Sequence, residues 1–388
     1  MKLCATVELE LGRSPITLTG HPATNVVEVS LFGPGRGESA AIHLGEGRWI
    51  VVDSCVDSRT KRVPVLEYLS AIGVDVTTQV RLVVATHAHD DHFAGIARIF
   101  EACRSATFVC PAALSTPEFF ALTDLDELEH AGLPIRAYSE YRRVFQIIDE
   151  RIDHGLEAVQ YALPQRHLYQ DAGQAISCDV LALSPSDKAF RRAMRAIRKA
   201  MPRADVPKYI EPIDPNELSI ALWVRAGDRL MLLGADMLKG PNGSGWHAVL
   251  SGPRPPQRAS VFKVSHHGSS TGHRGGVWSE LLLRSPIALL TPYRSSGLPK
   301  DTDCRRILNL TDAAYITAAG VRRPLEGRTR REAAAMGTLP LNVRELDGPP
   351  GQIRARSVVG AAPTDWAIDL GGPGRSLSTY LAELESSR

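Results

Sequence analysis

Apolar runs of strand length recur along the chain and are separated by polar turns and amphipathic segments. The first three predicted strands are Val26 to Phe32, Ala40 to Leu44 and Trp49 to Val52. The segment Arg62 to Ile72 has apolar residues at helical spacing and predicts a helix, after which Val80 to Ala85 predicts a fourth strand. Later apolar runs predict strands at residues 179–183, 218–224, 230–233, 261–264, 286–291, 314–317, 352–358 and 366–370.

Three segments depart from this pattern. Residues 112–170 contain acidic and aromatic segments of helical spacing and few strand signals, which predicts a helical insertion. Residues 188–201 predict a helix that is strongly basic. Residues 331–388 are rich in Arg and Gly, and their role is open. We therefore expect one domain over residues 1–330 and a C-terminal extension that packs on the same domain.

The composition narrows the class of protein. The 388 residues are 44% hydrophobic and 23% charged with a net charge of +2, which is ordinary for a water-soluble domain and argues for no general nucleic-acid or membrane affinity. No run of 18 apolar residues occurs, so we expect no membrane span. The six cysteines are widely spaced and form no CxxC pair, which predicts reduced thiols and a cytoplasmic location.

A dense polar loop follows the fourth predicted strand. Within six residues it contains His87, His89, Asp91 and His92, although the whole chain has only 12 His. Imidazole nitrogens and a carboxylate in this arrangement can bind two adjacent cations. A solvated polar loop would rarely concentrate histidines in this way, so the loop predicts a metal or catalytic site.

Three other predicted strands also end in candidate ligands. Asp53 follows the third strand, Asp236 follows the strand at 230–233, and the pair His266 and His267 follows the strand at 261–264. A lone Asp after a strand is usually a turn residue, but loops at one sheet edge converge on sites. We therefore expect these residues to join the histidine loop.

The loop resembles the HxHxDH motif of the metallo-β-lactamase superfamily. The order of the remaining motifs is similar to that of the soluble metallo-hydrolase domain of DNA-uptake competence channels. Three further stretches carry this resemblance: Gly35-Arg36-Gly37-Glu38-Ser39 resembles the GQGDS turn, Gly234-Ala235-Asp236 the TGD motif, and Phe262-Lys263-Val264-Ser265-His266-His267-Gly268-Ser269 the LKxxHHGS motif.

The resemblance implies an α/β fold, an αββα sandwich, with two divalent metal ions, Zn or Mn, at one sheet edge. It implies a hydroxide between the ions that attacks phosphorus or a carbonyl carbon. The implied ligands are His87 and His89 for the first ion, Asp91, His92 and one of the pair His266 and His267 for the second, and Asp236 for both. Of the pair, we favour His267 as the ligand. Asp91 and His266 would act in catalysis, with His266 on the substrate side, and Asp53 would lie behind the ligands.

The chain departs from the common superfamily pattern at one turn. Many members carry a third His there, whereas this chain has Ser184-Pro185-Ser186-Asp187. Asp187 is either a replacement ligand or the N-cap of the basic helix, since Asp is a favoured capping residue. An additional carboxylate ligand would favour harder metals such as Mn²⁺ beside Zn²⁺.

Two groups of residues are candidates for contacts to a phosphate-containing substrate. Arg36 and Ser39 lie in the Gly-rich turn. The alternative is that this turn is only an ordinary connection between two strands. Arg191, Arg195 and Arg198 recur at i, i+4 and i+7 along the basic helix. They form either a solvated face or a row that follows a phosphate backbone.

These features favour a cytoplasmic metal-dependent hydrolase of phosphodiester bonds, acting as a phosphodiesterase or nuclease on a nucleotide or nucleic acid. Two alternatives stay open: a hydrolase of a small ester, lactone or amide, and a metal-stabilised module without turnover that binds a partner. We expect no membrane partner, and the pattern does not predict the oligomeric state.

Overall fold

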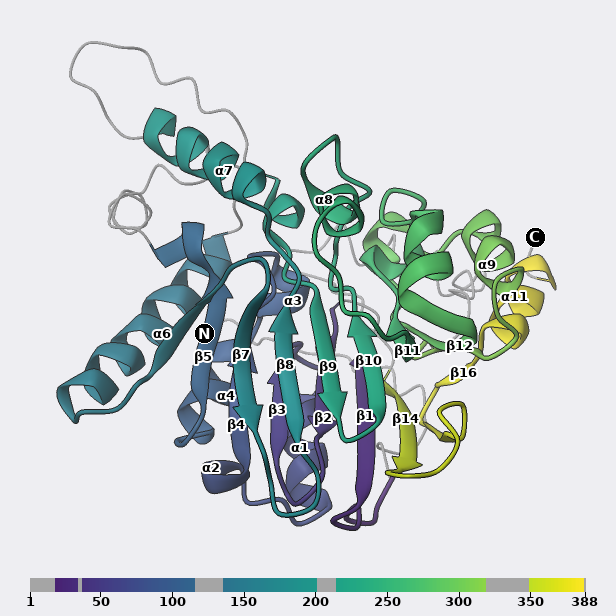
Figure 1. The fold of residues 1–388 in the computed structure, drawn as a ribbon, viewed down its shortest axis with the longest axis horizontal. Helices are drawn as coiled ribbons and strands as arrows, with labels where there is room; N and C mark the ends of the chain where they lie inside the picture. The colour runs from purple at the N-terminus through teal and green to yellow at the C-terminus, as the bar shows by residue number, and fades with distance from the viewer. Residues whose placement is uncertain (1–17, 34–36, 116–134, 201–213, 319–348, 387–388) are drawn as a thin grey trace, which may run out of the picture.

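The computed structural model describes residues 18–33, 37–115, 135–200, 214–318 and 349–386 (Figure 1). In this part of the chain the strands form two eight-stranded sheets. The first has the order β15-β14-β1-β2-β3-β4-β5-β6. Its strands are β1 (Val26–Gly33), β2 (Ser39–His43), β3 (Trp49–Val52), β4 (Val80–Val84), β5 (Thr107–Pro111), β6 (Val159–Ala162), β14 (Gly351–Val358) and β15 (Ala367–Gly371).

The second sheet has the order β16-β13-β12-β11-β10-β9-β8-β7. Its strands are β7 (Arg166–Asp171), β8 (Cys178–Ala182), β9 (Leu222–Ala226), β10 (Arg229–Leu233), β11 (Ala259–Lys263), β12 (Leu282–Leu290), β13 (Ala314–Ile316) and β16 (Arg375–Ser376). Most of these strands have continuous apolar runs because sheet faces on both sides are covered.

Helices connect the strands and cover the outer faces. The α-helices are α1 (Pro64–Ala71), α2 (Val76–Gln79), α3 (Asp90–Phe93), α4 (Ile96–Ala102), α6 (Ile135–Asp153), α7 (Asp187–Ala200), α8 (Gly245–Ser251), α9 (Asp301–Leu308) and α11 (Leu377–Ser386). Short helical turns of other types are η1 (Ala112–Ser115), η3 (Pro215–Leu218), η4 (His266–Gly268), η5 (Val277–Leu281) and η6 (Arg294–Ser296).

Three apolar clusters hold the layers together. The central cluster joins the facing sides of both sheets, with Leu31 and Val84 from the first and Val224 and Met231 from the second. A second cluster packs α1, α4 and α6 on the outer face of the first sheet. A third packs α8, α9 and α11 on the outer face of the second. The resulting order of layers, helix, sheet, sheet and helix, is the predicted αββα sandwich (Figure 1).

The prediction of a helical insertion over residues 112–170 is only partly right. Within the described residues it contains α6, but β6 and β7 follow and complete one end of each sheet. β7 is an edge strand whose side chains alternate between exposed and half-buried, with only Leu168 buried. Such a strand has no apolar run, so hydrophobic periodicity did not reveal it.

The described residues of the C-terminal extension join both sheets. β14 pairs antiparallel with β1 along its whole length, from Val26 opposite Val358 to Gly33 opposite Gly351. β16 pairs with β13, and Leu377 of α11 is fully buried in the outer cluster of the second sheet. These residues are therefore an integral part of the sandwich. No helix among the described residues is long and apolar enough to cross a membrane.

Candidate metal centre

The candidate site lies at the edge where five strands end or begin. β3 is parallel to β4, and β10 is parallel to β11, so the carboxyl ends within each pair lie together. β2 runs antiparallel to β3 with Ala40 opposite Val52, so the start of β2 also lies at this edge. The residues that directly follow or precede these strands therefore converge at this edge. They are Glu38, Asp53, the 86–92 loop, Asp236 and the pair His266 and His267.

The backbone at this edge is unusual. Asp53, Ala235, His266 and His267 have φ angles of 59°, 42°, 51° and 52°, in the left-handed region that non-glycine residues seldom adopt. Strained residues of this kind cluster at functional sites, where the surrounding structure holds them in place. Here each one turns the chain directly at or beside a candidate ligand.

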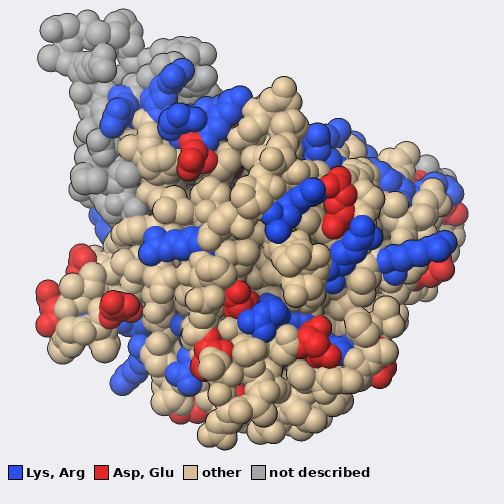
Figure 2. Space-filling view, in the orientation of Figure 1, with Lys and Arg blue, Asp and Glu red and all other residues tan. Residues whose placement is uncertain are grey.

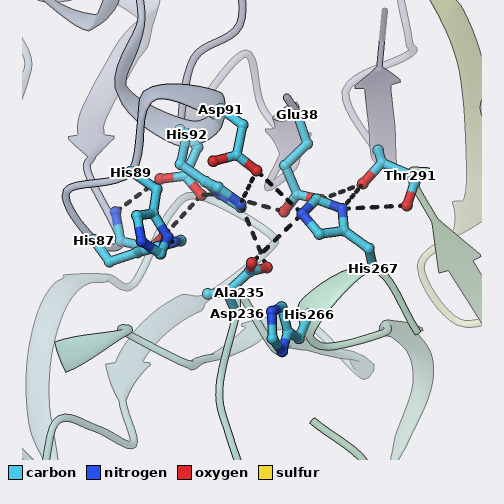
Figure 3. Close-up of polar contacts among 12 residues, drawn as sticks. Glu38, His87, His89, Asp91, His92, Ala235, Asp236, His266, His267 and Thr291 are labelled. Atoms are coloured by element: carbon cyan, nitrogen blue, oxygen red, sulfur yellow. Dashed lines mark hydrogen bonds and ion pairs between the residues drawn. The ribbon is translucent and has the colours of Figure 1, made fainter. Parts of the chain in front are cut away.

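Four side chains meet with their ligand atoms facing one another (Figure 3). His92 Nε2 lies 3.4 Å from Asp236 Oδ1 and 3.6 Å from Asp91 Oδ2. His267 Nε2 lies 3.2 Å from Asp91 Oδ2 and 3.4 Å from Asp236 Oδ2. His92 Nε2 and Asp236 Oδ1 are buried and form no hydrogen bond with the described residues. Buried polar atoms are normally satisfied, so two such facing atoms fit a cation between them.

His87 and His89 extend this group on one side. His87 is fully buried, and its ring centroid lies 4.2 Å from that of His92. The distance between His87 Nε2 and His89 Nδ1 is 3.2 Å. Burial and the neighbouring His92 hold the pKa of His87 well below its usual value, so this imidazole is neutral and able to bind a metal. The structure therefore brings six of the seven predicted ligands together.

The opposite ring nitrogens face a second layer of polar groups. His92 Nδ1 donates to Asp53 Oδ2 at 2.8 Å, and Asp53 accepts hydrogen bonds from the amide and hydroxyl of Thr86 at 2.7 and 2.8 Å. His267 Nδ1 lies 3.1 Å from Thr291 Oγ1. Partners of this kind orient metal-binding histidines and fix which nitrogen carries the proton.

Glu38 and Lys263 are buried in the same cluster, and neither was predicted as a site residue. The Lys263 ammonium forms an ion pair with Glu38 Oε1 and donates to the Ala235 carbonyl at 3.1 Å. The Thr291 hydroxyl donates to Glu38 Oε2. Two signals were available: Glu38 is the acid of the Gly-rich turn, and Lys263 is a lone charge at the end of an apolar strand.

The turn before β2 requires glycine for steric reasons. Gly37 has φ of 107°, and a Cβ there would lie 2.4 Å from the Asp91 carbonyl oxygen. The neighbouring Glu38 amide donates to this same oxygen at 2.9 Å. The Gly-rich turn thus packs directly against the metal loop and delivers Glu38 to the site.

The carboxylates keep two histidines protonated when no metal is bound. Burial alone would lower the pKa of His92, but Asp236, Asp91 and other carboxylates raise it well above its usual value. The same opposition, with Asp236 the strongest of the carboxylate contributions, raises the pKa of His267 to about 9. Because a metal binds the deprotonated nitrogen, metal binding would displace these protons.

His266 lies beside the cluster and outside its ligand set (Figure 3). It is half-buried, and its Nδ1 is 2.8 Å from the Thr271 hydroxyl. Burial lowers the pKa of His266, so its ring is neutral at pH 7. This placement suits a group beside the metals, while His267 occupies the ligand position.

The other predicted contacts are placed differently. Asp187 is exposed at the start of α7, whereas His87, His92, Asp236 and His267 are buried. The Ser186 hydroxyl accepts a hydrogen bond from the Ala189 amide at 3.2 Å. Ser186 therefore caps the helix, a role for which Asp187 was a candidate. Ser39 is buried with Oγ 3.6 Å from Cys55 Sγ, and Arg36 lies outside the described residues.

The basic helix α7 has the predicted exposed row. Arg191, Arg195 and Arg198 are exposed, and Figure 2 shows Lys and Arg side chains gathered over this helix. The buried side of the helix is formed by Ala189, Ala193, Ala196 and Ile197, whereas Phe190 and Met194 are only partly buried. The small alanines let the helix approach the layer beneath it closely.

Residues 33–162 match the family model of the metallo-beta-lactamase superfamily. This stretch includes β2 to β6 and contains Glu38, Asp53 and the HxHxDH loop. About a third of the chain is thus similar to the metallo-beta-lactamase superfamily. Asp236, Lys263 and His267 lie beyond the matched stretch, and the fold brings them to it.

Several solved structures are similar to this chain at low identity. The flavodiiron core of Flv1 from Synechocystis sp. PCC6803 has 10% identity and a TM-score of 0.30, covering 58% of this chain and 42% of its own. CmlA, a diiron beta-hydroxylase from Streptomyces venezuelae, has 15% identity and a TM-score of 0.31, covering 63% and 35%. A metallo beta lactamase from Hirschia baltica has 11% identity and a TM-score of 0.26, covering 58% and 73%.

The chain thus spans less than half of the flavodiiron core with which it aligns. No curated protein matches the chain. The narrower resemblance to DNA-uptake competence channels therefore stays a prediction.

Proposed function

We propose that this protein hydrolyses phosphodiester bonds with the help of two divalent metal ions. The residues that would hold the ions are His87, His89, Asp91, His92, Asp236 and His267. The mixture of imidazole and carboxylate ligands suits Zn²⁺ and Mn²⁺. When bound, such ions activate water at neutral pH and stabilise the negative charge that develops on the attacked group.

The protein's own groups then have separate tasks. Asp236 is buried and contacts both His92 and His267, so it holds the two halves of the site together. Asp91 makes similar contacts, but its side chain is 11% exposed. His92 and His267 hold the pKa of Asp91 below its usual value despite burial. Asp91 thus stays ionised, as a metal ligand must be.

His266 is the candidate for contact with the substrate. Its half-buried neutral ring is fixed by the hydrogen bond between Nδ1 and the Thr271 hydroxyl, so Nε2 is the nitrogen available to a substrate. In the tautomer with the proton on Nε2, the ring can donate a hydrogen bond to a leaving oxygen.

The exposed arginine row on α7 is the observation that favours phosphodiesters over small neutral esters. Arg191, Arg195 and Arg198 remain exposed, while the neighbouring Arg192 forms an ion pair with Glu217 at 2.9 Å. The helix starts after β8, and its first turn is tied to the loop after Asp236, because Ser186 Oγ donates to the Gly243 carbonyl. A chain of phosphates held along this row would contact several charges at once.

The test compares substrates on protein reconstituted with Zn²⁺ or Mn²⁺. We expect turnover of bis-p-nitrophenyl phosphate and of a single-stranded oligonucleotide, and little turnover of p-nitrophenyl acetate or a simple lactone. The Asp91→Asn variant is the matched negative control. Faster turnover of the acetate or lactone would contradict the proposal and favour the small-ester hydrolase. Metal binding without any turnover would favour the partner-binding module.

A further inference from the structure

We propose that Glu38 is a positioning residue, which supports His267 through Thr291, and that Lys263 is its permanent counter-ion. The inference rests on the proposed metal centre and assigns the two buried charges that the centre's ligand set leaves out. Glu38 has carboxylate oxygens close enough to His92, Asp236 and His267 to be grouped with them as a ligand. The directions of its contacts, however, distinguish Glu38 from the metal ligands.

Each imidazole has a metal side and a support side. On the Nε2 side, His92 and His267 both face the carboxylates of Asp91 and Asp236 at 3.2 to 3.6 Å. Glu38 lies on the other side, with Oε1 3.6 Å from His92 Nδ1 and Oε2 3.8 Å from His267 Nδ1. An ion bound to both Nε2 atoms would therefore have Glu38 behind the rings.

A hydrogen-bonded relay connects Glu38 to His267. The Thr291 hydroxyl donates its single proton to Glu38 Oε2, so its oxygen is left to accept from His267 Nδ1 at 3.1 Å, a shorter contact than the 3.3 Å from Nδ1 to the Thr291 carbonyl oxygen. With Nδ1 held as the proton-bearing nitrogen, Nε2 is the nitrogen that loses its proton when a metal binds. His92 has the same arrangement in a shorter form, since its Nδ1 donates directly to Asp53.

Lys263 explains why Glu38 stays in this position. Each oxygen of Glu38 already accepts from a buried donor, Oε1 from Lys263 and Oε2 from Thr291. Lys263 also donates to the Ala235 carbonyl, directly before Asp236, and is itself only 4% exposed. A buried carboxylate needs such a partner, and the ion pair holds it away from the metal ligands.

Thr291 provides the decisive test. The Zn²⁺ dissociation constants of the wild type, Glu38→Gln, Thr291→Val and Thr291→Ser are measured by competition with a chromophoric chelator, together with the visible spectrum of the Co²⁺ forms. We expect Glu38→Gln and Thr291→Val each to weaken one bound ion by about 10- to 100-fold and to shift the same Co²⁺ bands. Thr291→Ser keeps the hydroxyl and should restore wild-type values.

The alternative is that Glu38 binds metal directly. In that case Glu38→Gln would lose an ion while Thr291→Val kept wild-type affinity and spectrum, and the inference would be wrong. Combined loss in the Glu38→Gln/Thr291→Val double variant should not exceed that of either single variant, because both remove one relay. Additive losses would also overturn the relay.

Lys263 is tested by stability. Lys263→Met leaves the Glu38 charge buried without its partner, so we expect the Tm to fall, whereas Lys239→Met at an exposed lysine should not change it. The Lys263→Met/Glu38→Gln double variant should recover most of the Tm but keep the weakened metal binding. A double variant as unstable as Lys263→Met would contradict the counter-ion role.

These measurements need no substrate. A protein that binds metal as described but cleaves no phosphodiester would refute the proposed function and leave this inference intact. A protein that cleaves phosphodiesters but binds metal normally in Thr291→Val would refute only the inference.

Discussion

The two sheets contribute to the site in different ways. The first sheet supplies a contiguous loop, in which His87, His89 and His92 lie within six residues of sequence. The second sheet supplies single residues, Asp236 after β10 and His267 after β11, which are 31 positions apart and meet only because the two strands are parallel neighbours. The first half can be recognised from local composition, and the second half depends on topology.

The groups that support His92 and His267 also differ between the two sheets. His92 and its supporting acid Asp53 both belong to the first sheet, and their contact is direct. His267 belongs to the second sheet, but the acid that supports it, Glu38, comes from the first sheet and acts through Thr291. The second half of the site is thus assembled across the interface between the sheets, and its geometry depends on how the sheets pack.

The largest effect is expected at the residue that both halves share. Asp236→Ala removes a carboxylate that faces both His92 and His267, so we expect both ions to be lost and turnover to fall by more than about 100-fold, beyond what loss of an outer partner causes. His89→Ala affects the first sheet alone and should leave about one ion. Elemental analysis after reconstitution measures the metal content of both variants. If Asp236→Ala still bound two ions, Asp236 would not be the residue shared by the two halves of the site.

The direct and the relayed support can be ranked. Asp53→Asn loses the 2.8 Å charge-assisted contact to His92, so we expect metal affinity to fall by about 10- to 100-fold, and by more than in Glu38→Gln, where a hydroxyl intervenes. Chelator competition on both variants gives the ranking. Equal losses would mean that the distance of the acid from the ring is unimportant, and a larger loss in Glu38→Gln would reverse the assignment.

The arginine row lies outside both halves and should affect only long substrates. Replacing Arg191, Arg195 and Arg198 with Gln removes three phosphate contacts. The log–log salt slope for oligonucleotide binding should therefore become less negative by about 2 to 3. The KM for the oligonucleotide should rise, with bis-p-nitrophenyl phosphate turnover almost unchanged. A triple variant with the wild-type salt slope would show that the row is an ordinary solvated face.

The smallest effect is expected at Asp187. Its side chain is exposed and the cap is provided by Ser186, so Asp187→Asn should keep both ions and change the free energy of unfolding by about 0.5 kcal/mol or less. Metal content and denaturant unfolding of this variant test the expectation. Loss of one ion would restore Asp187 to the ligand set and extend the second sheet's contribution.

The strands and the ligands were easiest to predict where several polar residues lie close together between apolar segments. The strands β1 to β4 and the ligands of the first sheet follow from apolar runs and the dense histidine loop. Glu38 and Lys263 were missed because a single charge beside a strand usually lies in solvent, and only the three-dimensional pairing shows that both are buried. β6 and β7 were missed because edge strands lack the apolar runs of central strands.

One feature of the first sheet has a consequence for biosynthesis. β1 leaves the ribosome well before its partner β14, which is separated from it by more than 300 residues. At ordinary translation rates an interval of tens of seconds passes before the pairing can form. During that time β1, which is almost wholly buried in the finished fold, has an open edge that is a template for pairing with other chains. We expect the yield of folded protein to depend on the concentration of nascent chains and on chaperone capacity more than on the stability of the finished sandwich.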